Sequence, residues 1–125
     1  MIFEYTLDLL ESGRKTQTCR IARADEQAER GADGQIAAVT NKGRDKYRVG
    51  KTYAVQPGRG KPAVARIRLL GIEGKNIAEV TTAEAKAEGY QSREEFLGVW
   101  REIHGEKQMH ADVWVLKFEL VKDKT

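Results

Sequence analysis

The stretch DVWVLKFEL at residues 112–120 carries the clearest structural signal in the chain. Large apolar side chains occupy every second position of this stretch, namely Trp114, Leu116, Phe118 and Leu120. The charged residues Lys117 and Glu119 fall between them. A period of two is that of a β-strand with one buried face. The sequence therefore predicts a strand here, packed through its apolar face on a core.

Two helices are predicted before this strand. Each begins with the capping-box pattern S/T-x-x-E, at residues 81–84 and 92–95. The first is expected to end near Glu88, where Gly89 stops it. The second is expected to end at Gly105, and it carries one apolar stripe, made up of Phe96, Val99, Trp100 and Ile103.

The first half of the chain predicts a hairpin, a further strand and a short helix. Residues 51–55 and 63–70 are expected to pair across the turn PGRGKP. A strand is also predicted over 15–21. Before it, apolar residues spaced as in a helix predict a short helix that ends at Gly13, and these residues are Phe3, Leu7 and Leu10.

Residues 23–48 show no clear period, and we expect them to form a long, basic loop inserted in the domain. Within it, residues 24–30 could form one or two helical turns. A loop of this length in a small domain is usually functional or disordered.

The order of these elements predicts an α+β fold. Strands are expected near both ends of the sequence, with helices between them and no regular β-α-β alternation. A small, mostly antiparallel β-barrel with helices packed on it fits this order. At 125 residues, we expect residues 1–125 to form a single domain.

The net charge of +3 conceals a basic middle segment. Residues 13–68 hold 14 Lys or Arg and 5 Asp or Glu, whereas the segments on either side each carry a net charge of −3. Such a block could form an electropositive surface for a polyanion such as nucleic acid. The alternative is a solvated basic loop that binds no partner.

Composition argues against several other classes of protein. A single cysteine allows no internal disulfide. One cysteine and two histidines are too few ligands for a structural zinc site. We therefore expect no metal and no cofactor. No apolar run approaches the ~20 residues of a membrane helix. The first 12 residues are acidic, unlike a secretory signal, so a cytoplasmic protein is expected. The oligomeric state stays open.

Reactive side chains are densest in GRKTQTCR at residues 13–20. A lysine can act as a base toward a threonine hydroxyl if burial or a second cation keeps its amine neutral. In a regular strand, however, Lys15 and Cys19 would face one side and Thr18 the other. Lys15 and Thr18 can therefore meet only if the backbone bends near Thr16. The alternative is a basic strand start that contacts phosphate, with Cys19 as a buried, inert thiol.

The stretch LLESGRKTQTCR at residues 9–20 resembles the opening motif G-x-K-T-x-T-x-R of ASCH domains, which belong to the PUA-like superfamily. Two later stretches are similar to further family motifs: VGKTYAVQ at 49–56 and AEAKAEGY at 83–90. The resemblance covers nearly the whole chain except about residues 23–48. It implies a PUA-like β-barrel.

The resemblance also implies a choice of activities. ASCH domains are regarded as RNA-binding modules, compact members are amidohydrolases of N4-acetylcytidine, and others are ribonucleases. The catalytic set of the amidohydrolases corresponds here to Lys15, Thr18 and Glu88. We therefore expect binding of RNA or a modified nucleoside in a basic cleft, with hydrolysis of an N4-acylated cytidine as the leading activity. A non-catalytic RNA-binding module or a ribonuclease acting on single-stranded RNA is the alternative.

The ligand-binding residues are expected among cations and tyrosines. We expect four basic side chains to share a face with residues 23–48, namely Arg14, Arg20, Arg59 and Lys61. Tyr53 is the first candidate for stacking on a base, with Tyr47 and Tyr90 as further candidates. His104 and His110 have no acidic or thiol partner at ligand spacing, and we expect both at the surface.

Overall fold

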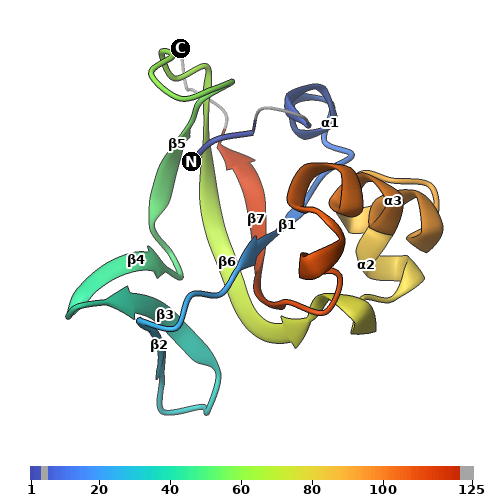
Figure 1. The fold of residues 1–125 in the computed structure, drawn as a ribbon. Coiled ribbons are helices and arrows are strands. Elements are labelled where there is room, and N and C mark those ends of the chain that lie inside the picture. The colour runs from blue at the N-terminus through green and yellow to red at the C-terminus, as the bar shows by residue number, and fades with distance from the viewer. Residues whose placement is uncertain (4–5, 122–125) are drawn as a thin grey trace.

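The structure, a computed structural model, describes residues 1–3 and 6–121 (Figure 1). Within this part of the chain, seven strands form one largely antiparallel sheet in the order β1-β7-β6-β3-β2, with β4 paired to β3 and β5 to β6. The strands are β1 (Gln17–Ile21), β2 (Glu26–Arg30), β3 (Ile36–Asn41), β4 (Arg44–Arg48), β5 (Thr52–Val55), β6 (Ala65–Asn76) and β7 (Asp112–Val121). The helices are α1 (Leu7–Glu11), α2 (Thr82–Ala87) and α3 (Arg93–His104), with short 3-10 turns at Ile77–Glu79 and Glu106–Gln108.

The elements predicted in the second half of the sequence are confirmed. The Thr81 hydroxyl accepts the Glu84 N–H while the Glu84 carboxylate accepts the Thr81 N–H, so α2 begins with a complete capping box. Ser92 caps α3 in the same position, through the Glu95 N–H. Gly105, with a φ of 87°, follows the last residue of α3. None of the helices in residues 1–3 and 6–121 is long and apolar enough to cross a membrane.

Strand β7 is buried on both faces at its centre, which its period of two did not predict. Leu116 and Phe118 pack on one face against strands β3 to β6, as expected. On the other face, Val113 and Val115 are fully buried against α2 and α3. The helices stop short of Lys117 and Glu119, which remain exposed and form ion pairs with β6. β7 therefore separates two apolar cores.

Strand β6 is longer than predicted and runs through the centre of the sheet. It pairs with β7 from Arg66 to Asn76, with β5 at its start, and with β3 at Ile72. The pairing with β7 shifts register between Leu69 and Gly71. A bulge of this kind bends a strand, which lets β6 reach both the β5 side and the helical side of the molecule (Figure 1).

The prediction of a long loop over residues 23–48 is wrong. The segment forms an antiparallel meander of β2, β3 and β4, and residues 24–30 are not helical. Lys42 and Gly43, at φ values of 51° and 80°, form the tight turn between β3 and β4. β2 escaped detection because it lies at the sheet edge and is exposed beyond Glu26, so it has no apolar alternation.

The expected barrel is an open sheet. β1 and β2 stand at opposite ends of the strand order and do not pair. The charged and exposed residues of β2 are typical of an edge strand that must not pair further. Helices α2 and α3 pack on one face of β1 and β7 (Figure 1), whereas Leu10 of α1 packs with Phe118 of β7.

Glu26 joins the meander to the central strand β7. Its side chain is fully buried, and its carboxylate accepts the Arg23 backbone N–H at 2.8 Å and the Trp114 Nε1–H at 2.9 Å. The Lys46 amine donates to its other oxygen. Burial alone would raise the pKa of Glu26, but these three donors outweigh it and lower the pKa.

We expect Glu26→Gln to lower the free energy of unfolding at neutral pH by about 1–3 kcal/mol, because it removes charge-assisted hydrogen bonds in a buried site. The folded pKa of Glu26 is lower than the unfolded one, about 4.3. The contribution of Glu26 to the free energy of unfolding is therefore complete above the unfolded pKa. It is lost as the pH falls through the folded pKa. Urea unfolding across acidic pH measures this difference.

The matched control is Glu29→Gln, because Glu29 is exposed and pairs with Arg48 on β4. An exposed pair contributes at most about 1 kcal/mol. Equal losses in the two variants, or the same pH dependence in the parent and Glu26→Gln, would show that Glu26 does not hold the meander.

Candidate functional site

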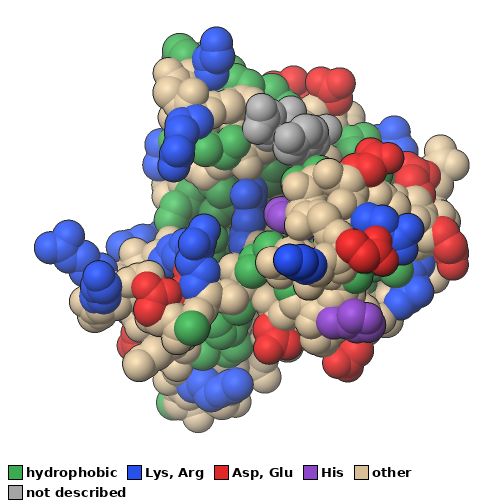
Figure 2. All heavy atoms as spheres, in the orientation of Figure 1, with side chains coloured by type: hydrophobic (Ala, Val, Ile, Leu, Met, Phe, Trp, Pro, Cys, Tyr) green, Lys and Arg blue, Asp and Glu red, His purple; other side chains and the backbone are tan. Residues whose placement is uncertain are grey.

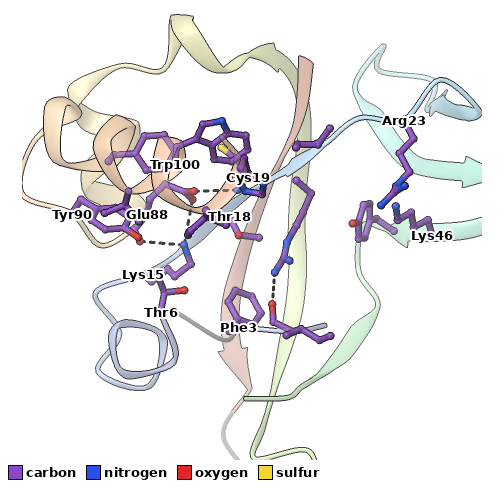
Figure 3. A pocket seen from close by; sticks show the side chains of 18 residues that line it. Phe3, Thr6, Lys15, Thr18, Cys19, Arg23, Lys46, Glu88, Tyr90 and Trp100 are labelled. Carbon is purple, nitrogen blue, oxygen red and sulfur yellow. Dashed lines mark hydrogen bonds and ion pairs between the residues drawn. The ribbon is translucent and has the colours of Figure 1, made fainter. Parts of the chain in front are cut away.

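A pocket of about 490 Å³ opens between β1, β4 and α3. Its polar side chains include Lys15, just before β1, Thr18 of β1, Glu88 at the end of α2 and Lys46 of β4. Its volume lies within the range of about 300–1,000 Å³ that is typical of small-molecule sites. Figure 3 shows Lys15, Thr18 and Glu88 pointing toward one another at one end of it.

Lys15 is held beside α2 by the backbone before β1. The Lys15 N–H donates to the Leu9 carbonyl at 2.9 Å, and the Thr16 N–H donates to the Ala87 carbonyl at 2.7 Å. The side chain is 4% exposed. Its amine donates to the Glu88 backbone carbonyl at 3.2 Å and lies 3.6 Å from Glu88 Oε2.

Glu88 is the last residue of the α2 turn, and Gly89 reverses the chain directly after it. A Cβ on Gly89, whose φ is 102°, would stand 2.8 Å from Leu9 Cδ1, so glycine lets α2 approach α1 closely. The Glu88 carboxylate is 3% exposed and accepts the Cys19 N–H at Oε1, at 3.1 Å. Its Oε2 is buried and has no hydrogen-bond partner within the described part of the chain.

Burial shifts both members of this pair toward their neutral forms. Loss of solvent lowers the pKa of Lys15, and Arg20 lowers it further, although Glu88 acts in the opposite direction. Loss of solvent also raises the pKa of Glu88, although Lys15 and the Cys19 N–H oppose this. Titratable groups whose environments move their pKa values in this way are candidates for acid and base roles.

The start of β1 explains how Lys15 and Thr18 come to the same pocket. β1 begins at Gln17, so Lys15 precedes the regular strand and the alternation of faces does not apply to it. Gln17, Thr18 and Cys19 are all buried, and Thr18 and Cys19 both line the pocket. As expected, the Cys19 thiol is buried, and loss of solvent together with Glu88 raises its pKa.

Aromatic rings from α3 and its preceding loop form one wall of the pocket. Tyr90 and Phe96 lie 5.6 Å apart, and Trp100 and His104 lie 4.0 Å apart, measured between ring centroids. His104 is exposed, as expected, but it also lines the pocket, which its sequence context did not predict. Burial of its ring and the charge of Arg20 lower its pKa.

Arg20 lies across the pocket floor. Its Nη2 donates to the Ile2 carbonyl at 2.8 Å, and its guanidinium stands 5.1 Å from the centre of the Phe3 ring. Its Nε is buried, and its N–H makes no hydrogen bond to any residue that the structure describes. Within residues 1–3 and 6–121, no three His, Cys, Asp or Glu side chains converge as metal ligands do.

The known structures most similar to this fold include an ASCH domain. The ASCH domain from Lactobacillus crispatus JV V101 superposes with a TM-score of 0.61 at 19% identity, over 94% of this chain and 74% of that one. This chain has the ASCH-domain fold. The protein EF3133 from Enterococcus faecalis V583 superposes with a TM-score of 0.57 at 23% identity, over 91% of this chain and 68% of that one.

The hypothetical protein PH0355 superposes over 97% of this chain and 100% of its own length, with a TM-score of 0.55 at 15% identity. No family model and no curated protein sequence matches the chain. These likenesses establish the ASCH fold, and the roles of the pocket residues rest on the geometry given above.

Of the five expected ligand-binding residues, only Arg20 lines this pocket of the ASCH fold. Arg14 is exposed before β1, and Arg59 and Lys61 lie in the exposed turn between β5 and β6. The Tyr53 hydroxyl accepts the Arg48 N–H at 2.7 Å, and the ring packs on two apolar cores. Tyr53 is therefore a packing residue in this fold, whereas Tyr47 and Tyr90 line the pocket.

The segment 23–48 is less basic than we expected when we described it as a basic loop. It holds 6 Lys or Arg and 5 Asp or Glu, a net charge of +1. Several of these charges pair with one another, notably Arg48 with Glu29 and Asp45. Figure 2 nevertheless shows Lys and Arg side chains gathered on the strand side of the molecule, with Asp and Glu more frequent on the helical side. The excess of basic residues over positions 13–68 therefore comes mostly from residues outside 23–48.

The Lys15–Glu88 pair should show strong coupling in a double-mutant cycle. Lys15→Met leaves a buried carboxylate without its cation, and Glu88→Gln leaves a buried amine without its anion, so each should lower the free energy of unfolding by about 3 kcal/mol. The double variant should lose clearly less than the sum of the two, because it buries no lone charge. Urea unfolding of all four proteins gives the coupling, and additive losses would show that the two groups do not interact.

Proposed function

We propose that the pocket binds a modified nucleoside and hydrolyses the amide of an N4-acylated cytidine. The observation that carries this proposal is the burial of Lys15 and Glu88 together in the pocket that also holds the Thr18 side chain. Amide hydrolysis needs a nucleophile, a base and an acid, and these three side chains supply one candidate for each role.

Lys15 is the base in the first step. Burial lowers the pKa of Lys15, which increases the share of neutral amine. The neutral amine takes the Thr18 hydroxyl proton, and Thr18 Oγ1 attacks the carbonyl carbon of the amide. Lys15 Nζ donates to the Glu88 carbonyl in this structure, and catalytic hydrogen bonds of this kind often tighten only once substrate is bound.

Glu88 is the acid in the second step. Burial raises the pKa of Glu88, and no described residue forms a hydrogen bond with Oε2, so this oxygen can carry a proton. That proton passes to N4 as the C–N bond breaks, and cytidine leaves with the acyl group held as an ester on Thr18. Water, deprotonated by the resulting carboxylate, then attacks the ester carbonyl and the C–O bond to Thr18 breaks, which releases the free acid. The Lys15 ammonium returns its proton to Thr18 Oγ1, and this restores both the hydroxyl and the neutral amine.

The aromatic wall suits a nucleobase. Tyr90, Phe96 and Trp100 present ring surfaces to the pocket, and bases bind proteins largely through contacts with such surfaces. Phe96 and Trp100 are nearly fully buried, so their rings are held in place before ligand enters.

The basic strand side in Figure 2 favours a second candidate function, the binding of single-stranded RNA. If such a surface contacts phosphates, the logarithm of the binding constant should fall linearly with the logarithm of the salt concentration. Incubation with labelled single-stranded RNA separates the alternatives. Cleavage would indicate a ribonuclease, and salt-sensitive binding without cleavage would indicate a non-catalytic module.

Lys15→Ala should reduce the turnover of N4-acetylcytidine by about 100-fold or more, the usual scale for a lost general base. Thr18→Ser should retain activity because it keeps the hydroxyl, whereas Thr18→Val should lose it while keeping the volume and branching of the side chain. Release of cytidine, followed by chromatography, measures each rate.

The matched control for Lys15→Ala is Lys86→Ala, which removes an exposed lysine of α2 that does not line the pocket. Turnover should be unchanged in that variant. Parent-like hydrolysis by Lys15→Ala, or by Thr18→Val, would exclude the proposed mechanism.

The pH profile of kcat/KM should be bell-shaped. Activity should rise with pH as Lys15 loses its proton, at an apparent pKa below the usual value of about 10.4. At still higher pH, activity should fall as Glu88 loses its proton, at an apparent pKa above about 4.3. Glu88→Gln should keep some activity, and its kcat/KM should no longer fall at alkaline pH. A pH profile of this variant identical to that of the parent would show that Glu88 is not the acid.

A further inference from the structure

A second group of charged side chains lies at the other end of the pocket. Arg20 of β1, Arg23 after β1 and Lys46 of β4 all line it, and we refer to these three residues as the cationic end. Figure 3 shows Arg23 and Lys46 together on the side formed by the meander, opposite Lys15 and Glu88. The proposed hydrolysis gives Arg23 and Lys46 no role, and Arg20 enters it only by lowering the pKa of Lys15.

The charge of the cationic end is only partly compensated within the described chain. Lys46 pairs with Glu26, but neither Arg20 nor Arg23 forms an ion pair with a described carboxylate. The Arg20 Nε is also buried and has no hydrogen-bond partner among the described residues. Of the described residues that line the pocket, four are lysine or arginine and one, Glu88, is acidic.

Tyr47 lines the pocket with these cations, and Lys46 Nζ lies 5.5 Å from the centre of its ring. Burial raises the pKa of Tyr47, while the charges of Lys46, Arg20 and Arg23 each oppose that rise. All three therefore lie within electrostatic reach of the Tyr47 side chain, which is itself part of the pocket wall. Two guanidinium groups, an ammonium and a hydroxyl that line one pocket form a donor set suited to phosphate oxygens.

We propose that the cationic end binds a phosphate group, so that the pocket prefers a cytidine nucleotide to the free nucleoside. This inference rests on the proposed function, since it assumes that the base lies at the Lys15 and Glu88 end. A mononucleotide would then extend along the pocket, with its base against the aromatic wall, its ribose in the middle and its phosphate between the arginines.

The phosphate could belong to a free mononucleotide or to the end of an RNA chain. Both present the same oxygens to Arg20, Arg23 and Lys46, so the structure identifies the shared chemistry. The source is separated by comparing cytidine 5′-monophosphate with a short single-stranded oligoribonucleotide that carries the same terminal nucleotide.

Arg23→Ala is the most informative variant. The Arg23 side chain is exposed and makes no hydrogen bond within the described chain, and its contact with Glu26 runs through the backbone N–H, which alanine keeps. The matched control is Arg44→Ala, which removes an equal charge from the same meander at an exposed position outside the pocket. Thermal unfolding of both variants checks that the fold is retained.

The experiment is titration calorimetry of the parent and both variants with cytidine and with cytidine 5′-monophosphate. The parent should bind the nucleotide about tenfold or more tightly, as expected for charge-assisted hydrogen bonds to phosphate. Arg23→Ala should lose most of this preference and bind cytidine as the parent does. Arg44→Ala should retain the preference, and Arg23→Lys should restore part of it.

Equal affinity of the parent for cytidine and its monophosphate would overturn the proposal, as would equal effects of Arg23→Ala and Arg44→Ala. Tighter binding of the oligoribonucleotide that also depends on Arg23 would support the phosphate site and identify RNA as its source. A nucleotide preference that depends on Arg23, in a protein that releases no cytidine from N4-acetylcytidine, would support the phosphate site and refute the hydrolase. Hydrolysis of N4-acetylcytidine without any preference for the nucleotide would support the hydrolase and refute the phosphate site.

Discussion

The buried contact of Glu88 with the start of β1 holds the site and the fold together. One carboxylate oxygen accepts the Cys19 N–H, and the other stands near the Lys15 amine. These contacts join α2 to a strand about 70 residues earlier in the chain, as the separation of 69 positions between Cys19 and Glu88 shows. Because a carboxylate is costly to bury, its retention here requires the donors that Lys15 and β1 provide. The same cost is what makes its protonation state responsive to a ligand.

Most of the helical half could be predicted from the sequence, because its signals are local. The Thr81 capping box, the Ser92 cap and the glycine after α3 each act within a few residues, and the structure has all three. The meander over residues 23–48 could not be predicted, since β2 is an exposed edge strand that gains its structure from β3 rather than from its own pattern. The open sheet escaped prediction for a similar reason, because strand order depends on contacts between distant segments.

The candidate site was predicted in part. Lys15, Thr18 and Glu88 were identified through a motif resemblance, and they meet in one pocket. The basic residues that line its other end were not identified as a group, because Arg23 and Lys46 come from the segment that has no local pattern. Glu26 was also missed, since a glutamate in a charged stretch gives no sign that it will be buried. Arg59 and Lys61 have the right chemistry, but the β5–β6 turn carries them away from the pocket.

The chain contains two tryptophans, and each belongs to a different polar cluster. Trp100 lines the pocket against His104, whereas Trp114 donates its indole N–H to Glu26 beneath the meander. Indole emission responds to neighbouring charges and to solvent, so the molecule carries two intrinsic optical reporters at separate places. A protein that retains only Trp100 would report ligand entry, and one that retains only Trp114 would report detachment of the meander. The two events could thus be followed independently, without attaching a dye.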